Sequence, residues 1–242
     1  MIFDRRDVDS AGEKLKGDIP WNSYNEPAIV RLFAVANGWR EAHLAPMRHI
    51  HLQLAAAIRR QQLNGVVASR LKRMPSIRRK LQKITVPLSK IQDLGGCRVI
   101  LPSMREVRAF STAFQQSGVH HVRSVTDYIQ APKAGGYRSV HLMVSHRDER
   151  FDAYRDRRVE LQVRSLLQHA WATAVEAVGL FRGEDLKGGS GNADWLRLFL
   201  LLAGEFAEAE GWAPVPGTPA QADRQAEIRE LDQALMPTDV LD

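Results

Sequence analysis

Four short β-type runs constrain the fold of this 242-residue chain more than any other feature of its sequence. They lie at residues 97–101, 122–129, 137–145 and 158–165, and the last three show partial alternation of apolar and polar side chains. Segments with helical periodicity surround and interrupt these runs, at residues 27–38, 40–63, 76–83, 103–117, 166–180, 192–210 and 220–235. This order predicts an α+β fold, in which helices flank a mixed β-sheet and extend it at the N- and C-terminal ends.

The same pattern predicts three regions along the chain. Residues 1–39 form an N-terminal lead-in and helix, and residues 1–24 lack clear periodicity. Residues 40–182 contain the β-type runs and form the core. Residues 183–242 form a C-terminal helical extension, which a Gly- and Pro-rich linker interrupts at residues 211–219.

Acidic residues are missing from a long stretch of the chain. Residues 42–92, the basic window, contain 11 Lys or Arg and no Asp or Glu, although the formal net charge of the whole chain is only +6. Because the positive charge is local, it predicts a local anionic partner. The alternative is a basic helix face that only contacts water.

The composition excludes several classes of protein. No stretch approaches 18 consecutive apolar residues, and no apolar run follows the charged N-terminus, so we expect neither a membrane span nor a signal peptide. Cys97 is the only cysteine, which excludes a disulfide framework and a cysteine-rich zinc site. A single cysteine also favours a reducing, cytoplasmic location.

The segment from Lys133 to His141 has the residue types of a pocket for a phosphate and a base. Gly135 and Gly136 allow the backbone to approach a ligand, Lys133 supplies a charge, and Tyr137 offers a ring face for stacking. His141 lies four residues after Tyr137, on the same side if the segment is a strand. The alternative is a β-turn followed by a core tyrosine.

Two acidic residues are candidates for a metal site. Asp93 lies just before the Gly95-Gly96 entry to a β-type run, and Glu160 interrupts an otherwise apolar or amide run. Two such carboxylates suit Mg²⁺ bound to a triphosphate, because this ion takes few protein ligands. Alternatively, Asp93 caps a turn and Glu160 faces water from an edge strand.

The basic window also offers a candidate phosphate-binding helix face. Ser76 and Lys80 are four residues apart and therefore share a face. Arg70 and Lys72 precede this helix, and its guanidinium neighbours could stack on a base. Those neighbours are Arg73, Arg78 and Arg79.

In this order the motifs resemble the synthetase domain of the RelA/SpoT family. They are Arg70-x-Lys72-x-x-x-Ser76-x-x-x-Lys80, Asp93-x-x-Gly96-x-Arg98, Asp127-Tyr128-Ile129-x-x-Pro132-Lys133-x-x-Gly136-Tyr137-x-Ser139-x-His141 and Glu160-x-Gln162-x-Arg164. The resemblance covers residues 40–182 and implies a nucleotidyltransferase-like fold. It also implies a pyrophosphokinase, which moves the β,γ-pyrophosphate of ATP onto a ribose 3′-hydroxyl.

The resemblance assigns roles residue by residue. For the donor, Arg70 and Arg98 would sandwich the adenine of ATP, and its phosphates would contact Lys72, Ser76 and Lys80. Asp93 and Glu160 would bind Mg²⁺, with Glu160 also the candidate base. For the acceptor, the base would stack on Tyr137, its phosphates would lie near Lys133 and His141, and the strand end would be supported by Gln162 and Arg164. The family commonly has Asn where this chain has Gly135, which weakens any inference about guanine specificity.

The flanking segments resemble the toxic small alarmone synthetases of toxin–antitoxin modules. The matching motifs are Trp39-Arg40-x-x-His43-x-x-Pro46, the run from Gln168 to Glu176, and Leu186-Lys187-Gly188-Gly189 with Trp195. This resemblance implies an antitoxin partner and leaves a homo-oligomer open. No His-Asp dipeptide is present for the family's hydrolase domain, so we expect a synthetase-only member. The alternative for Trp39, Trp171, Trp195, His43 and His169 is a structural role in packing.

The acceptor stays open between GDP or GTP, as in (p)ppGpp alarmone synthesis, and the 3′ end of tRNA. The basic window holds more cations than ATP needs, which favours tRNA slightly. The candidate tRNA contacts are Arg73, Arg78, Arg79 and Lys83. Two other functions remain as alternatives: a catalytically silent nucleic-acid-binding module, and a nucleotidyltransferase that transfers NMP.

Overall fold

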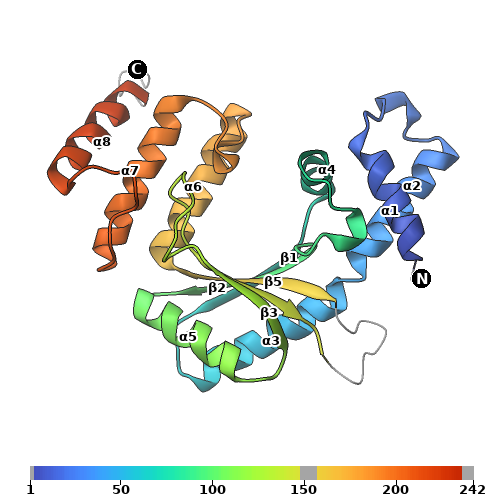
Figure 1. Ribbon diagram of the computed structural model, residues 1–242, viewed down its shortest axis with the longest axis horizontal. Coiled ribbons are helices and arrows are strands. Elements are labelled where there is room, and N and C mark those ends of the chain that lie inside the picture. Colours follow the sequence, from blue (N-terminus) through green and yellow to red (C-terminus); the bar gives the residue numbers. More distant parts are fainter. Residues whose placement is uncertain (1–2, 148–156, 236–242) are drawn as a thin grey trace, which may run out of the picture. The chain divides into compact units, whose positions relative to one another are not determined.

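The computed structural model describes residues 3–147 and 157–235, and Figure 1 shows the arrangement of their helices and strands. Five strands form one sheet in the order β1-β2-β5-β4-β3. Their bounds are β1 Val66–Leu71, β2 Gly95–Leu101, β3 His121–Asp127, β4 Val140–Ser145 and β5 Arg158–Ser165. The α+β fold with a mixed sheet is therefore confirmed.

The helices follow the predicted order with small changes at their ends. Their bounds are α1 Arg5–Lys16, α2 Pro27–Glu41, α3 Leu44–Arg60, α4 Met74–Lys83, α5 Met104–Gln116, α6 Leu166–Arg182, α7 Ala193–Ala209 and α8 Gln221–Leu235. Short 3₁₀ turns are η1 Trp21–Ser23, η2 Leu88–Lys90 and η4 Leu186–Gly188. Within the described residues, no helix is both long and apolar enough to cross a membrane.

The chain divides into two compact units. The first consists of the described residues of Met1–Val99, Ala113–Val125 and Leu142–Gln162. The second consists of those of Ile100–Thr112, Thr126–His141 and Val163–Asp242. Candidate site residues occur in both units, and each unit is described by itself below.

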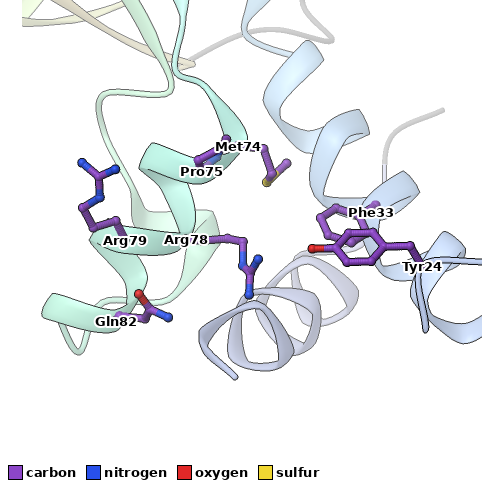
Figure 2. A pocket seen from close by; sticks show the side chains of 7 residues that line it. All are labelled: Tyr24, Phe33, Met74, Pro75, Arg78, Arg79 and Gln82. Carbon is purple, nitrogen blue, oxygen red and sulfur yellow. The ribbon is translucent and has the colours of Figure 1, made fainter. Parts of the chain in front are cut away.

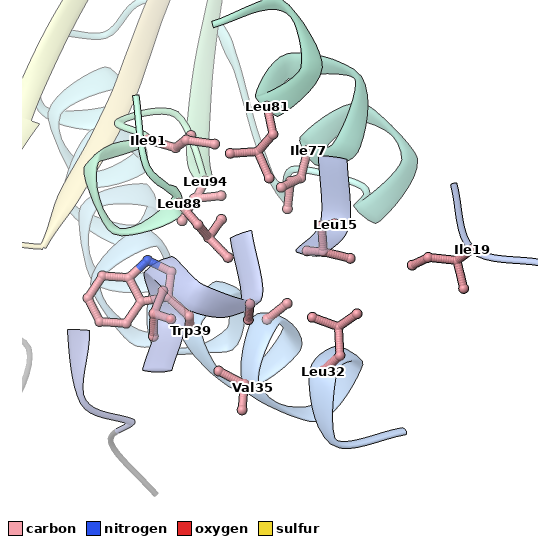
Figure 3. Close-up of a cluster of buried hydrophobic side chains, with 13 residues drawn as sticks. Leu15, Ile19, Leu32, Val35, Trp39, Ile77, Leu81, Leu88, Ile91 and Leu94 are labelled. Carbon is pink, nitrogen blue, oxygen red and sulfur yellow. The ribbon is translucent and has the colours of Figure 1, made fainter. Parts of the chain in front are cut away.

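Helix α1 corrects the prediction of an unstructured lead-in. Its side chains at Val8, Ala11 and Leu15 are buried at helical spacing, and Asp4 caps its N-terminus through the Arg6 amide. This narrow apolar stripe contacts α2 and α4 and belongs to the buried cluster in Figure 3. The prediction failed because most residues of α1 are charged or small, so the stripe is short.

Strand β1 was not predicted, and β4 begins later than expected. β1 is at one edge of the sheet, and its side chains alternate between exposed and half-buried, so its apolar signal is weak. β4 begins at Val140, because Gly136 N donates to Lys133 O at 2.8 Å and closes a turn before it. Tyr137 therefore lies in the connection before the strand rather than within it.

The second unit has its own buried cluster. It includes Tyr137, Trp171, Leu186, Trp195 and Phe199, which come from the connection before β4 and from α6, η4 and α7. Trp171 donates its indole N–H to the Phe199 carbonyl at 2.7 Å. Trp39 is likewise buried in the first unit, so the packing alternative for all three tryptophans is confirmed.

Candidate active site

Asp93 is held between two lysines in the first unit. Lys72 Nζ lies 2.9 Å from its Oδ2, and Lys80 Nζ lies 2.8 Å from its Oδ1. Lys72 follows β1, Lys80 is on α4, and Asp93 precedes β2, so three segments meet at this ion triplet. Burial by itself would raise the pKa of Asp93, but the two lysines hold it below the ordinary value of 3.8. The carboxylate is therefore ionised at neutral pH.

Three adjacent strands bring Arg70 and Glu160 to either side of Gly96. A methyl group on Gly96 would lie 3.8 Å from the Arg70 carbonyl oxygen and 3.9 Å from the Glu160 carbonyl oxygen. Glu160 is on β5, the middle strand of the sheet, so it is not an edge-strand residue. Its Oε2 accepts a hydrogen bond from Gln162 Nε2 at 2.6 Å. The two residues share one face of β5, while Val159, Leu161 and Val163 are buried on the other.

Asp93 and Glu160 both lie in the first unit, and carboxylates are the protein ligands that Mg²⁺ prefers when phosphate oxygens complete its coordination. Asp93 is ionised and already attracts two cations, as expected of a group that can bind a metal ion. No group of three or more His, Cys, Asp or Glu in the described residues could hold a metal by itself. Two carboxylates are too few for a closed structural metal site. They suit Mg²⁺ that arrives bound to a triphosphate.

The remaining donor candidates are in the same unit. Arg70 is exposed on β1, and Arg98 is half-buried on the neighbouring strand β2. Ser76 is half-buried on α4, one turn before Lys80. Arg40, which is not among the predicted ATP-binding residues, donates from its Nε to the Lys72 carbonyl at 2.7 Å. This bond ties α2 to the backbone between β1 and α4 and explains one residue of the Trp39-Arg40 motif.

A different face of α4 borders a hollow of about 460 Å³. Figure 2 shows the lining side chains, with the stacked pair Tyr24 and Phe33 on one side and α4 on the other. Those from α4 are Met74, Pro75, Arg78, Arg79 and Gln82. Arg79 is exposed, whereas Arg78 donates to the carbonyls of Leu15 and Gly17 at 3.2 and 3.0 Å. The lining includes two arginines and no acidic residue, so it carries a positive charge.

The acceptor candidates meet around Tyr137 in the second unit. The Tyr137 hydroxyl lies 2.6 Å from His141 Nε2 and accepts from Arg164 Nη2 at 2.5 Å. Lys133 Nζ lies 5.4 Å from the centre of the Tyr137 ring and 4.7 Å from that of Tyr128. Tyr137 is only 6% exposed, so a stacking base would have to displace side chains that now cover the ring.

A buried ion pair fixes the chain on either side of Tyr137. Arg138 Nη2 lies 2.6 Å from Glu210 Oε2, and the two side chains are 3% and 6% exposed. Gly136 has φ +89°, and a methyl group there would lie 2.6 Å from the Ala203 side chain. Gly135 has open space around it, so packing does not explain the absence of a side chain at that position.

Histidines form a cluster that the sequence analysis missed. His49 Nδ1 lies 2.9 Å from His146 Nε2, and the ring of His120 lies within 6 Å of both. The three residues are far apart in sequence, and only tertiary structure brings them together. His43 is buried and bonded to the Trp39 carbonyl, and burial lowers its pKa to about 4, so its structural role is confirmed.

The comparisons with known proteins match the same region. A family model described as a region found in RelA / SpoT proteins matches residues 69–183. GTP pyrophosphokinase YjbM of Bacillus subtilis is 30% identical over 110 residues, 44% of this chain and 52% of that protein. GTP pyrophosphokinase YwaC of the same species is 31% identical over 111 residues, 43% and 53% of the respective chains. The chain spans about half the length of these curated relatives.

Solved structures extend the likeness beyond that region. Small alarmone synthetase 2 of Bacillus subtilis superposes with a TM-score of 0.61 at 19% identity, covering 72% of this chain and 93% of that one. Small alarmone synthetase 1 of that species, bound to its product pppGpp, gives 0.59 at 19%, covering 80% and 97%. Residues 69–183 of this chain thus match the region found in RelA / SpoT proteins. The fold is the one seen in small alarmone synthetases.

Proposed function

We propose that this protein is an ATP-dependent pyrophosphokinase that transfers the β,γ-pyrophosphate of ATP to the ribose 3′-hydroxyl of GDP or GTP. The ion triplet of Lys72, Asp93 and Lys80 carries the proposal, because it lies in the RelA/SpoT region and in the same unit as Glu160. The triplet places two ammonium groups beside an ionised carboxylate, which are the groups a bound triphosphate and its metal require. The names of the curated relatives support GTP chemistry.

The donor residues act by position and charge. When ATP binds, Lys72 and Lys80 exchange the Asp93 oxygens for phosphate oxygens, while Arg70 and Arg98 hold the adenine. Mg²⁺ bound by Asp93 and Glu160 would offset the negative charge that develops on the pyrophosphate. Arg40 keeps the Lys72 backbone in place during this exchange.

Glu160 is the proposed base for the acceptor hydroxyl. The amide of Gln162 donates to Oε2 of Glu160 and so orients its carboxyl group. The carboxylate then accepts the proton as the 3′-oxygen attacks the β-phosphorus and AMP leaves. On the acceptor side, the ring of Tyr137 stacks on the base of the acceptor nucleotide. His141 and Arg164 hold the Tyr137 hydroxyl in place.

One experiment tests this function and separates it from the alternatives. The protein is incubated with ATP labelled on the γ-phosphate and, separately, with GDP, GTP, adenosine nucleotides or deacylated tRNA. Label in GDP or GTP, with AMP as the second product, supports the proposal. Pyrophosphate as the product would indicate a nucleotidyltransferase that transfers NMP, and no magnesium-dependent turnover would indicate a silent binding module.

The 3′ end of tRNA is the second candidate acceptor. Seven Lys or Arg residues of the basic window are exposed and have no proposed role in binding ATP. They are Arg48, Arg59, Arg60, Arg73, Arg79, Lys83 and Lys90. Such cations, with the hollow beside α4, suit backbone phosphates. We also propose a cytoplasmic location, an antitoxin partner and self-association. Native mass measurement tests self-association.

A further inference from the structure

The carboxylate of Glu210, at the end of α7, binds two residues that come from separate parts of the chain. Its Oε2 accepts from Nη2 of Arg138 at 2.6 Å, and its Oε1 accepts from the Ser165 hydroxyl. Arg138 directly follows Tyr137, and Ser165 directly follows Arg164. One carboxylate therefore joins the two segments whose side chains meet in the hydrogen bond from Arg164 to the Tyr137 hydroxyl. All five residues belong to the second unit.

This carboxylate bridge is buried, and its two ends are fixed by the helices that carry them. Glu210 is the C-cap residue of α7, and Gly211 after it adopts φ +68°, which ends the helix there. Ser165 caps α6, because its hydroxyl accepts from the Gln168 amide at 3.1 Å and its own amide donates to Gln168 Oε1 at 3.2 Å. The bridge thus joins the end of one helix to the start of another.

The ion pair within the bridge is better suited to fixing a distance than to stabilising the fold. Arg138 and Glu210 lose their hydration when they are buried, so such a pair adds little net stability over apolar residues of the same volume. Its charge-assisted hydrogen bonds are short and directional, however, so they restrict the positions of both partners. The segments that contain Tyr137 and Arg164 are therefore held at a defined separation.

We propose that Glu210 is a positioning residue for the transfer reaction, which sets the place of the Tyr137 ring relative to Arg164. It acts through Arg138 and Ser165 rather than by contact with a nucleotide. Glu210 lies outside residues 69–183, the region that the RelA / SpoT family model matches. The inference rests on the proposed function, and it gives the C-terminal extension a part in the reaction.

A double variant, Arg138→Met with Glu210→Met, separates position from stability. It removes the bridge but leaves no unpaired buried charge, so it should be more stable than either single variant. In steady-state transfer by the full chain, we expect KM for the acceptor to rise roughly tenfold, because a small displacement of a positioning side chain is enough for such a loss. KM for ATP should stay unchanged, because the candidate ATP-binding residues belong to the other unit. A stable double variant with the wild-type acceptor KM would overturn the inference.

Glu205→Gln is the matched control for the double variant. Glu205 is also on α7 and pairs with Arg224, which is 0% exposed, but this pair joins α7 to α8. The control should lower the denaturation midpoint and leave both KM values unchanged. An equal rise of the acceptor KM in the control would overturn the inference, because any damage to α7 would then have the same effect.

Ser165→Gly decides the question if the double variant does not fold. It breaks one arm of the bridge, keeps the pair of Arg138 and Glu210, and places a residue that is tolerated at an N-cap. We expect the acceptor KM to rise roughly threefold, with KM for ATP unchanged. An unchanged acceptor KM in a folded Ser165→Gly protein would overturn the inference.

A double-mutant cycle tests the positioning without reference to the reaction. Tyr137→Phe is made in the wild type and in the double variant, and its effect on the denaturation midpoint is compared. If the bridge holds Tyr137 within hydrogen-bonding distance of Arg164, loss of the hydroxyl should lower the midpoint of the wild type clearly more than that of the double variant. This result supports the inference even if no acceptor becomes labelled and the proposed reaction fails. Equal shifts in the two backgrounds would overturn it, whatever the acceptor.

Discussion

The Tyr137 hydroxyl accepts a hydrogen bond from Nη2 of Arg164 at 2.5 Å, and Arg164 is 1% exposed. A buried guanidinium depends on such partners, because an unsatisfied charged group in the interior is costly. The ring chosen from the sequence as a stacking surface is therefore also the partner of a buried cation. This second role changes what a conservative substitution of Tyr137 should do.

Tyr137→Phe should lower the free energy of unfolding by about 1–3 kcal/mol, since Arg164 and His141 both lose a hydrogen-bond partner. Tyr128→Phe is the control, because no hydrogen bond of its hydroxyl occurs within the described residues. Chemical denaturation measures both. For the acceptor KM, in contrast, Tyr137→Phe should be mild, because Phe keeps the ring, and Tyr137→Ala should be severe. Equal stability of Tyr137→Phe and wild type would show that the hydroxyl has no structural role.

Asp93→Asn should lower the rate of pyrophosphate transfer at least about a hundredfold, because it removes the charge proposed to bind the metal. The fold should be preserved, because the side-chain volume does not change. It also frees Lys72 and Lys80 from their shared carboxylate. We therefore expect metal-free ATP to bind the variant at least as tightly as wild type, by calorimetry.

Glu160→Gln supplies the comparison for Asp93→Asn. It should also abolish transfer, but it leaves Lys72 and Lys80 paired with Asp93, so metal-free ATP affinity should change less than in Asp93→Asn. Substantial turnover in either variant, with normal thermal unfolding, would rule out the assigned pair.

His43 should make stability depend on pH. Burial lowers its pKa from 6.5 to about 4, so between these values the unfolded state binds a proton that the folded state excludes. The contribution is full above pH 6.5 and is lost as the pH falls toward 4, by about 3 kcal/mol in total. His43→Asn can still donate to the Trp39 carbonyl but cannot titrate. Its unfolding free energy should fall less between pH 7 and 4, and parallel curves would refute the assignment.

Substitutions of Arg78 and Arg79 should have different effects on stability, although the two residues are adjacent in the sequence. Arg78→Gln breaks bonds to the C-terminal carbonyls of α1 and should cost about 1–3 kcal/mol of stability. Arg79→Gln should change stability by less than about 0.5 kcal/mol, because its side chain is exposed. Denaturation of the two variants measures the difference, and equal losses would contradict it. Arg79→Glu alone is thus the clean probe of salt-dependent tRNA labelling, because Arg78 also has a structural role.

The sequence by itself determined most of the helices and four of the five strands. Long apolar stripes in α2, α3 and α7 and the β5 alternation are local patterns, so periodicity predicts them. It failed at α1, whose buried stripe includes the small residues Ala11 and Gly12 among many charged ones, and at β1, where no side chain is fully buried. The candidate ATP-binding residues could also be predicted, because the order of charged motifs along the chain is visible in the sequence.

Only the tertiary structure decided which of these residues meet. Asp93 is 21 residues from Lys72 and 13 from Lys80, and no local pattern predicts that one carboxylate pairs with both. The contact of Lys187 with the Tyr137 ring joins positions 50 residues apart through the packing of α6 against the η4 turn. Periodicity reports how one segment buries its own face, whereas charge pairing across segments depends on where the whole chain places them.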